Sequence, residues 1–178
     1  MMWRQFLIDR FGENAINPWC CLRDGGEAII AQVLEGKGIH CAVEIGTFHG
    51  ISAQYISRFV DKVITIDVEE RPETKLIREF CRNPKVEYFV VKNDEEKKEL
   101  ISRLDFQFAF IDGLHNHMVD FDAEITKHCG NLLFHDYKNG FKFPEEAVLK
   151  LPPGIVTEYF QFGHWIAGGE KLVFKKHE

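Results

Sequence analysis

The sequence lacks the patterns that mark disulfide-rich, zinc-binding and membrane-spanning chains. Its five cysteines are odd in number and scattered, and no two form a C-x-x-C pair, so neither a disulfide framework nor a zinc site is expected. No run approaches the roughly 18 consecutive apolar residues of a membrane span. Residues 1–11 include Arg4, Asp9 and Arg10, which is not the pattern of a secretory signal. We therefore expect a cytoplasmic protein with no membrane partner.

An excess of positive charge is also missing. The formal net charge is −6, and the only basic cluster is Lys171, Lys175 and Lys176. Nucleic-acid-binding surfaces normally gather Lys and Arg on one face, so no nucleic-acid partner is expected. A hydrophobic content of 45% with 16 Phe is well above that of disordered chains.

Strand and helix patterns alternate over residues 41–134. Short apolar runs at 41–45, 63–66, 86–91, 106–111 and 131–134 are separated by segments with helical periodicity, which is typical of βαβ units and a parallel sheet. Two later strand patterns, at 155–160 and 171–175, are joined by a connection too short for a crossover helix and should be antiparallel. We predict an α/β, Rossmann-like, mostly parallel seven-stranded sheet with an antiparallel last strand and helices on both faces.

Two further helices are expected before the first strand. Apolar residues at helical spacing occupy 3–11, and Asp24 and Glu27 form a capping-box pattern that opens a second helical segment over 28–34. We expect one domain, 1–178, with an N-terminal helical extension at 1–38 and a ligand-binding core at 39–178. The extension could lie over the ligand site or form a homodimer face.

Polar residues follow the first five strands of the expected sheet. They lie at 44–50, 67, 93–94, 112–115 and 135–137. In open α/β sheets, ligands bind outside the carboxyl ends of the strands. We therefore place the functional site at this edge.

The turn after the first strand predicts a nucleoside ligand without phosphates. Gly46 and Gly50 allow close backbone approach, and Asp67 lies about 20 residues on, where an acid can accept from ribose hydroxyls. Phe48 stands where G-x-G-x-x-G has its second glycine, which disfavours a nicotinamide-dependent oxidoreductase. Glu44 would repel phosphate and suits a cationic ligand. A glycine turn that serves only tight packing is the alternative.

At these residues the sequence resembles a known family. The stretch 44–53 resembles motif I of class I S-adenosylmethionine-dependent methyltransferases, in the variant found in catechol O-methyltransferase-like enzymes, and 65–67 looks like the acidic motif that follows. The stretches 110–115 and 133–137 are similar to later motifs of bacterial sugar and macrolide O-methyltransferases. The resemblance covers roughly residues 39–176 and implies S-adenosylmethionine as cofactor.

The resemblance also assigns cofactor contacts by position. Glu44 and Gly46 would lie near the amino-acid part of the cofactor, and Ser52 would bind its carboxylate. Asp67 would hold the ribose, and Val68, Asn93 and Asp94 would border the adenine. The expected cofactor-binding residues are Glu44, Gly46, Thr47, Phe48, Gly50, Ser52, Asp67, Val68, Asn93, Asp94, Asp112 and Gly113.

Catalytic and metal roles are implied for later strand ends. Catechol-type enzymes hold a divalent cation with an aspartate after the fourth strand and an Asp-Asn pair after the fifth. Asp112 and Asp136 match these positions, and Tyr137 replaces the Asn. Mg²⁺ held by Asp112 and Asp136 is therefore one expectation, and the alternatives are that both aspartates cap helices or orient a histidine. His115, and second His135, is the candidate base for deprotonating a hydroxyl acceptor.

The resulting functional hypothesis is an S-adenosylmethionine-dependent methyltransferase that acts on oxygen of a small molecule or sugar. The alternative is a catalytically inactive S-adenosylmethionine-binding module with an interaction or sensing role. The acceptor pocket would be built from the N-terminal helices and the loop at 138–143. Such loops vary freely with function, so the sequence does not identify the methyl acceptor.

Overall fold

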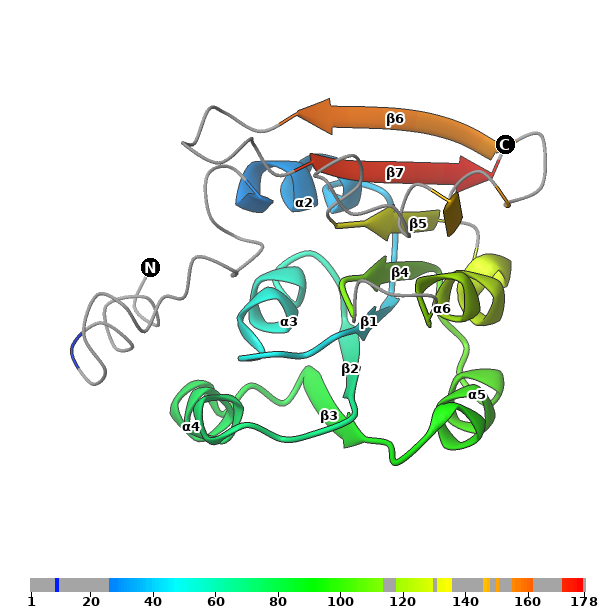
Figure 1. The fold of residues 1–178 in the computed structure, drawn as a ribbon. Helices are drawn as coiled ribbons and strands as arrows, with labels where there is room; N and C mark the ends of the chain where they lie inside the picture. Colours follow the sequence, from blue (N-terminus) through cyan, green and yellow to red (C-terminus); the bar gives the residue numbers. More distant parts are fainter. Residues whose placement is uncertain are drawn as a thin grey trace.

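The computed structural model describes residues 9, 26–113, 118–129, 131–135, 146–147 and 150, and the backbone of 155–161 and 171–177. Helices and strands alternate from residue 26 to residue 134 (Figure 1). In chain order they are α2 (Gly26–Leu34), β1 (Cys41–Ile45), α3 (Ile51–Ile56), β2 (Lys62–Asp67), α4 (Pro72–Cys81), β3 (Val86–Val90), α5 (Asp94–Ser102), β4 (Phe108–Ile111), α6 (Met118–Thr126), the 3₁₀ turn η3 (Lys127–Cys129), β5 (Asn131–Phe134), β6 (Ile155–Gln161) and β7 (Lys171–His177).

All strands belong to one sheet with the order β3-β2-β1-β4-β5-β7-β6. The first five strands along the chain pair in parallel, with β1 at the centre between β2 and β4. β7 pairs antiparallel with β5 and with β6, which extends the sheet at the top of Figure 1. The predicted α/β, Rossmann-like fold with a parallel sheet is confirmed. Reversal of strand order on either side of β1 creates the switch point where α/β proteins bind ligands.

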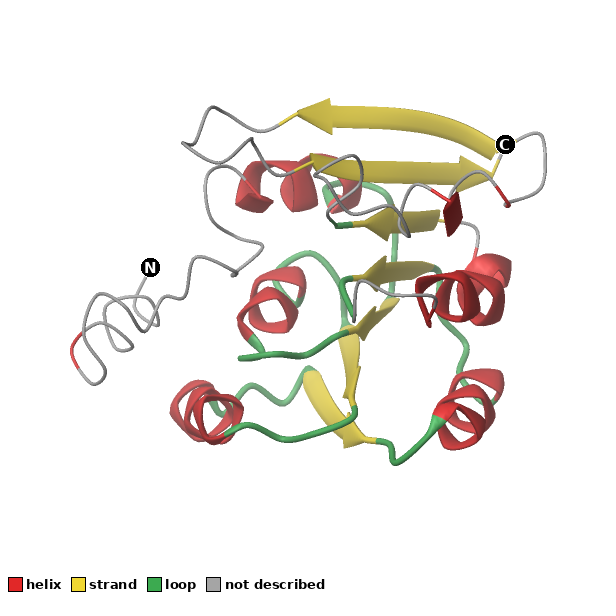
Figure 2. Cartoon of the chain, viewed as in Figure 1, coloured by secondary structure: helices red, strands yellow, loops and turns green. Residues whose placement is uncertain are grey.

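The two faces of the sheet carry separate cores. Side chains alternate along a strand, so Ala42 and Glu44 of β1 face one layer, and Val43 and Ile45 face the other. The first core includes apolar residues of α2 and α3, and the second includes apolar residues of α5 and α6. Figure 2 shows helices on both sides of the yellow strands. Near-continuous burial of β1, β2 and β4 follows from this double coverage.

Local sequence signals set two helix starts. Pro72 occupies the first turn of α4, where its missing N–H breaks no hydrogen bond. Asn93 is the N-cap of α5, and its Oδ1 accepts a 2.9 Å hydrogen bond from the backbone N–H of Glu96. Both signals can be read in the sequence, as a proline that suits a first helical turn and as an Asn three residues before a Glu.

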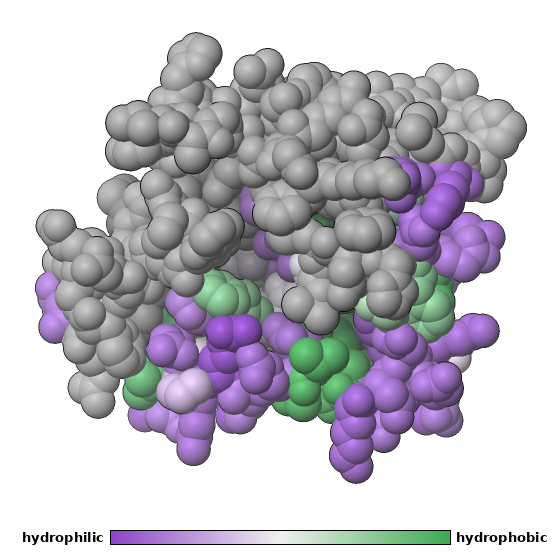
Figure 3. All heavy atoms as spheres, in the orientation of Figure 1, coloured by the Kyte–Doolittle hydropathy of each residue, from purple (hydrophilic) through white to green (hydrophobic). Residues whose placement is uncertain are grey.

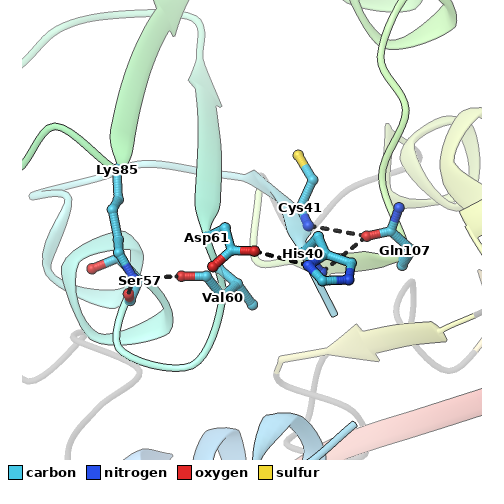
Figure 4. A network of polar contacts seen from close by, with 7 residues as sticks. All are labelled: His40, Cys41, Ser57, Val60, Asp61, Lys85 and Gln107. Atoms are coloured by element: carbon cyan, nitrogen blue, oxygen red, sulfur yellow. Dashed lines mark hydrogen bonds and ion pairs between the residues drawn. The ribbon is translucent and has the colours of Figure 1, made fainter. Parts of the chain in front are cut away.

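The amino ends of the parallel strands are linked by polar contacts (Figure 4). Nδ1 of His40 lies 2.8 Å from Oδ2 of Asp61, which joins the starts of β1 and β2. Oε1 of Gln107 accepts hydrogen bonds from the backbone N–H groups of His40 and Cys41, at 3.1 and 3.0 Å. The side chain of Lys85 donates to two backbone carbonyls ahead of β2. These contacts satisfy polar groups at the edge opposite the predicted ligand site.

Several predictions concern residues outside the described part of the chain. They are the helix at 3–11 except Asp9, the cap at Asp24, the loop at 138–143, and His115, Asp136 and Tyr137. The second N-terminal helix is confirmed as α2. The division of the chain at residue 38 and the homodimer stay predictions.

The described surface is mainly polar. Figure 3 shows hydrophilic side chains over most of the coloured part of this face, with small hydrophobic groups among them. Among the described residues, the large apolar side chains that are exposed are those of Val68, Phe80 and Val90. No helix in the described ranges has both the length and the apolar character needed to cross a membrane.

Candidate functional site

Gly46 allows the chain to turn tightly after β1. Its φ is +100°, and a Cβ at this position would lie 2.1 Å from the backbone oxygen of Asp112. Its N–H donates to the carbonyl of Ile66 at 2.9 Å. The turn is therefore pressed between the ends of β2 and β4, and a side chain at residue 46 would displace one of them.

Phe48 takes the place of the second glycine of a dinucleotide motif. Its φ is +47°, a left-handed conformation that is unfavourable for a bulky residue. Its ring stacks on His49 with centroids 3.9 Å apart, and the Arg71 guanidinium lies 4.8 Å from its centroid. The hydroxyl of Thr74 donates to its carbonyl. Contacts with α4 and the residue before it thus hold the turn in this conformation.

Asp67 at the end of β2 is fixed by the same turn. Its Oδ2 accepts a 2.9 Å hydrogen bond from the backbone N–H of Phe48, and its Oδ1 accepts a 2.7 Å hydrogen bond from that of Val68. A carboxylate offers about four lone-pair sites. Asp67 is therefore oriented by the protein and can still accept from the two hydroxyls of a ribose.

Glu44 lies fully buried on the sheet face covered by α3. It is opposite Thr65 in the β1–β2 register, and the Thr65 hydroxyl donates to its Oε2 at 2.5 Å. Thr47 Oγ1 lies 2.6 Å from Thr65 Oγ1. Burial raises the pKa of Glu44 to about 8; the Ser52 and Thr65 hydroxyls lower it and neighbouring carboxylates raise it. Glu44 is therefore mostly protonated at neutral pH in the folded protein.

A pocket of about 190 Å³ opens at the carboxyl edge of β1, β2 and β4. Five of the residues that were expected to bind cofactor line it together: Gly46, Asp67, Val68, Asp94 and Gly113. Its other lining residues are Ile45, Ile66, Val91, Lys97, Met118 and Asp122. The pocket thus combines apolar walls with a few charged side chains, the composition typical of small-molecule sites.

Other predicted cofactor residues have structural partners instead of a place in this pocket's lining. Asn93 caps α5, and Gly50 packs so closely that a Cβ there would lie 2.9 Å from the Tyr88 ring. Ser52 is buried and its hydroxyl faces Glu44. These contacts shape the turn and the adjacent helix.

Asp112 and His135 form a pair after β4 and β5. Oδ1 of Asp112 lies 2.7 Å from Nδ1 of His135, and their side chains are 16% and 4% exposed. Asp112 therefore contacts His135, the second of the two candidate bases. Within the described ranges, no group of three His, Cys, Asp or Glu is arranged to hold a metal ion, and Asp136 lies outside them. The described residues do not support the expected Mg²⁺ site.

Lys97 and Asp122 also lie in the pocket wall, a position that was not expected from the sequence. Lys97 Nζ lies 2.5 Å from Oδ1 of Asp122 and 3.5 Å from Oδ1 of Asp94. Both side chains are almost fully buried, at 8% and 2% exposure. The spacing of these residues could have predicted their burial. Lys97 lies one helical turn before Ile101, and Asp122 lies three residues after Val119, so each charged residue shares the buried face of its helix.

Comparison with solved structures identifies the fold. An O-methyltransferase from Bacillus cereus in complex with SAH superposes with a TM-score of 0.70 at 15% identity, covering 99% of this chain and 97% of that one. An rRNA methylase from Streptococcus thermophilus gives 0.65 at 18% identity, covering 85% and 93%. The N-methyltransferase NodS from Bradyrhizobium japonicum WM9, in complex with S-adenosyl-L-homocysteine, gives 0.65 at 13% identity, covering 98% and 97%.

These likenesses show that the chain has the fold of class I S-adenosylmethionine-dependent methyltransferases. At such identities they establish the fold alone. The sequence matches no protein-family model and no curated protein. Because the three structures carry the names of O-, N- and rRNA methyltransferases, the shared fold does not distinguish between acceptors.

Proposed function

We propose that this chain is an S-adenosylmethionine-dependent methyltransferase that methylates oxygen on a small molecule or sugar. The observation that carries the proposal is the pocket in which the Gly46 turn, the oriented carboxylate of Asp67 and Asp94 meet. Two solved structures of this fold contain the demethylated cofactor, which supports the same ligand here. We further propose that residues 1–178 act as one domain.

An adenosine group fits the chemistry of the pocket. Asp67 would accept from both ribose hydroxyls, since its oxygens retain lone pairs beyond the two backbone hydrogen bonds. Val68 and Val91, with other apolar side chains, would flank the base. Phe48 replaces the glycine with which dinucleotide sites approach a pyrophosphate, in accord with a phosphate-free nucleoside.

We further propose that Glu44, which is buried and does not line the pocket, sets the charge preference at the amino-acid end of the site. Its carboxyl lies beneath the turn and is neutral at neutral pH because of burial. An ammonium group of the ligand near Glu44 would favour the ionised carboxylate, which would then act as the counter-ion of the ligand's amino acid moiety. A phosphate would gain no such partner.

Methyl transfer is an in-line displacement, in which the protein mainly aligns the reacting atoms and excludes water. Bound S-adenosylmethionine supplies a methyl group activated by its sulfonium. The chain must also take a proton from a hydroxyl acceptor. His135, held by Asp112 at 2.7 Å, is the base candidate that the structure describes, and His115 stays a prediction. We assign no step to a cation, since Asp112 is engaged with His135.

Isothermal titration calorimetry with S-adenosylmethionine, S-adenosylhomocysteine and NAD⁺ tests the proposal. We expect saturable binding of the first two and none of NAD⁺. No binding of either adenosyl compound would refute the proposal, and NAD⁺ binding would revive an oxidoreductase. A methyl-transfer assay over hydroxylated small molecules and sugars follows. Binding with no turnover over that panel would favour the non-catalytic module.

A further inference from the structure

The Lys97–Asp122 ion pair has no part in the function proposed above, although it lines the same pocket. It joins α5 to α6, with Nζ and Oδ1 2.5 Å apart. Desolvating two charges is costly, and an apolar pair of similar size would often be as stable. Stability alone therefore does not account for an ion pair in the wall of a ligand pocket.

The pair lies where the base of a bound nucleoside would be. If Asp67 holds the ribose and the Gly46 turn faces the amino acid moiety, the base extends toward α5 and α6. Asp94 and Lys97 of α5 and Asp122 of α6 line that part of the pocket. Asp122 also lies close to Gly113, another lining residue, because a Cβ on Gly113 would be 3.4 Å from Oδ2 of Asp122.

The charges at this end favour a hydrogen-bond donor on the ligand. Asp94 and Asp122 each contribute one negative charge and Lys97 one positive charge, which leaves a net charge of about −1. Ionised carboxylates only accept hydrogen bonds. An exocyclic amino group on the base would complement them, whereas an oxo group would place its lone pairs against theirs.

We propose that Lys97 and Asp122 make the pocket selective for a 6-amino purine, adenine, over its 6-oxo counterpart. Asp122 accepts from the amino group, and Lys97 holds Asp122 in place and in its ionised form. The inference rests on the proposed function, because it assumes that an adenosyl ligand occupies this pocket.

The role of Lys97 follows from the environment of Asp122. Burial raises the pKa of Asp122, and the charge and hydrogen bond of Lys97 lower it. Removing the ammonium would leave a buried carboxyl that takes up a proton. A protonated carboxyl can donate to an oxo group, so the preference for the amino group should weaken.

The test compares S-adenosylhomocysteine with S-inosylhomocysteine, in which an oxo group replaces the 6-amino group. Calorimetry on the full chain gives the ratio of the two dissociation constants. We expect wild type to favour the adenosyl compound by about 10- to 100-fold, the range for hydrogen bonds to charged groups. Lys97→Met should reduce this ratio to within about threefold of one. Lys62→Met, which removes a lysine paired with Glu87 on the surface, is the matched control and should keep the wild-type ratio.

The double variant Lys97→Met/Asp122→Leu keeps the inference testable if the single variant does not fold, because it leaves no unpaired buried charge. Circular dichroism and thermal melting establish that it is folded. A ratio near one supports the inference. A wild-type ratio in the folded double variant would overturn it, since Asp94 alone would then select the base. Equal binding of the two compounds by wild type would also overturn it, while leaving the proposed function intact. Absence of any S-adenosylhomocysteine binding would instead overturn both.

Discussion

Glu44→Gln tests the buried carboxyl beneath the cofactor turn. Glu44 is fully buried and its pKa is raised from 4.5 to about 8 by burial. In the unfolded chain the carboxyl ionises near pH 4.5, whereas in the folded protein it keeps its proton until about pH 8. Between these values the folded state binds one more proton than the unfolded state, so the free energy of unfolding decreases as the pH rises.

The expected size follows from the proton linkage. Each pH unit between the two pKa values removes about 1.4 kcal/mol of stability, so about 3 kcal/mol is lost by pH 7 and about 5 kcal/mol by pH 8. Gln resembles the protonated carboxyl in shape and does not titrate. The variant should therefore match wild type near pH 4.5 and be more stable by a few kcal/mol at pH 8.

Urea unfolding of wild type and variant at several pH values between 5 and 8.5 measures this difference. Subtracting the two curves removes the contribution of groups that both proteins share. Glu87→Gln, at a half-exposed position on the edge strand β3, controls for the loss of a carboxylate. A difference between Glu44→Gln and wild type that stays constant with pH would show that Glu44 is already ionised in the folded protein.

Three further predictions concern the same edge of the sheet. Asp67→Ala should weaken S-adenosylhomocysteine binding by about 1 to 3 kcal/mol through lost ribose hydrogen bonds, whereas Asp61→Ala at the opposite edge should not; unchanged calorimetric affinity would remove Asp67 from that role. Gly46→Ala should cost roughly 2 to 5 kcal/mol of unfolding free energy, because its Cβ would meet a backbone oxygen at 2.1 Å. Gly36→Ala, also at positive φ but with open space around it, should cost only about 1 to 2 kcal/mol. Equal losses of unfolding free energy in the two variants would contradict the predicted steric clash at residue 46. Finally, affinity for S-adenosylmethionine should rise between pH 6 and 8 in wild type and stay constant in Glu44→Gln, because the ligand ammonium favours ionised Glu44. Parallel pH profiles of the two proteins would show that binding is not coupled to the ionisation of Glu44.

The sequence was sufficient for the fold class because short-range and periodic signals agreed. Alternating apolar runs predicted the parallel strands, and the capping-box pattern of Asp24 and Glu27 predicted the helix before β1. The position of Asp67 at the end of β2 followed from the apolar run at 63–66 that directly precedes it. The structure added that its carboxylate accepts from the backbone of Phe48 and Val68, a contact between separate loops that no local pattern encodes.

The remaining site features depend on pairings between distant helices and strands. Lys97 and Asp122 are 25 residues apart, and each resembles an ordinary surface charge until its helix is packed against the sheet. Asp112 was expected to bind a metal or orient a histidine, and its contact with His135 depends on the adjacency of β4 and β5. Residue spacing predicts which strand ends carry acids, but not which neighbour each acid contacts.

A crystal structure of the chain with S-adenosylhomocysteine is the most direct test of the central claim. We expect the adenosyl group to fill the pocket at the carboxyl edge of β1, β2 and β4. Its ribose hydroxyls should lie within hydrogen-bond distance of the Asp67 carboxylate, with the base toward Asp94. A ligand bound elsewhere, or an empty pocket at saturating ligand concentration, would contradict the account.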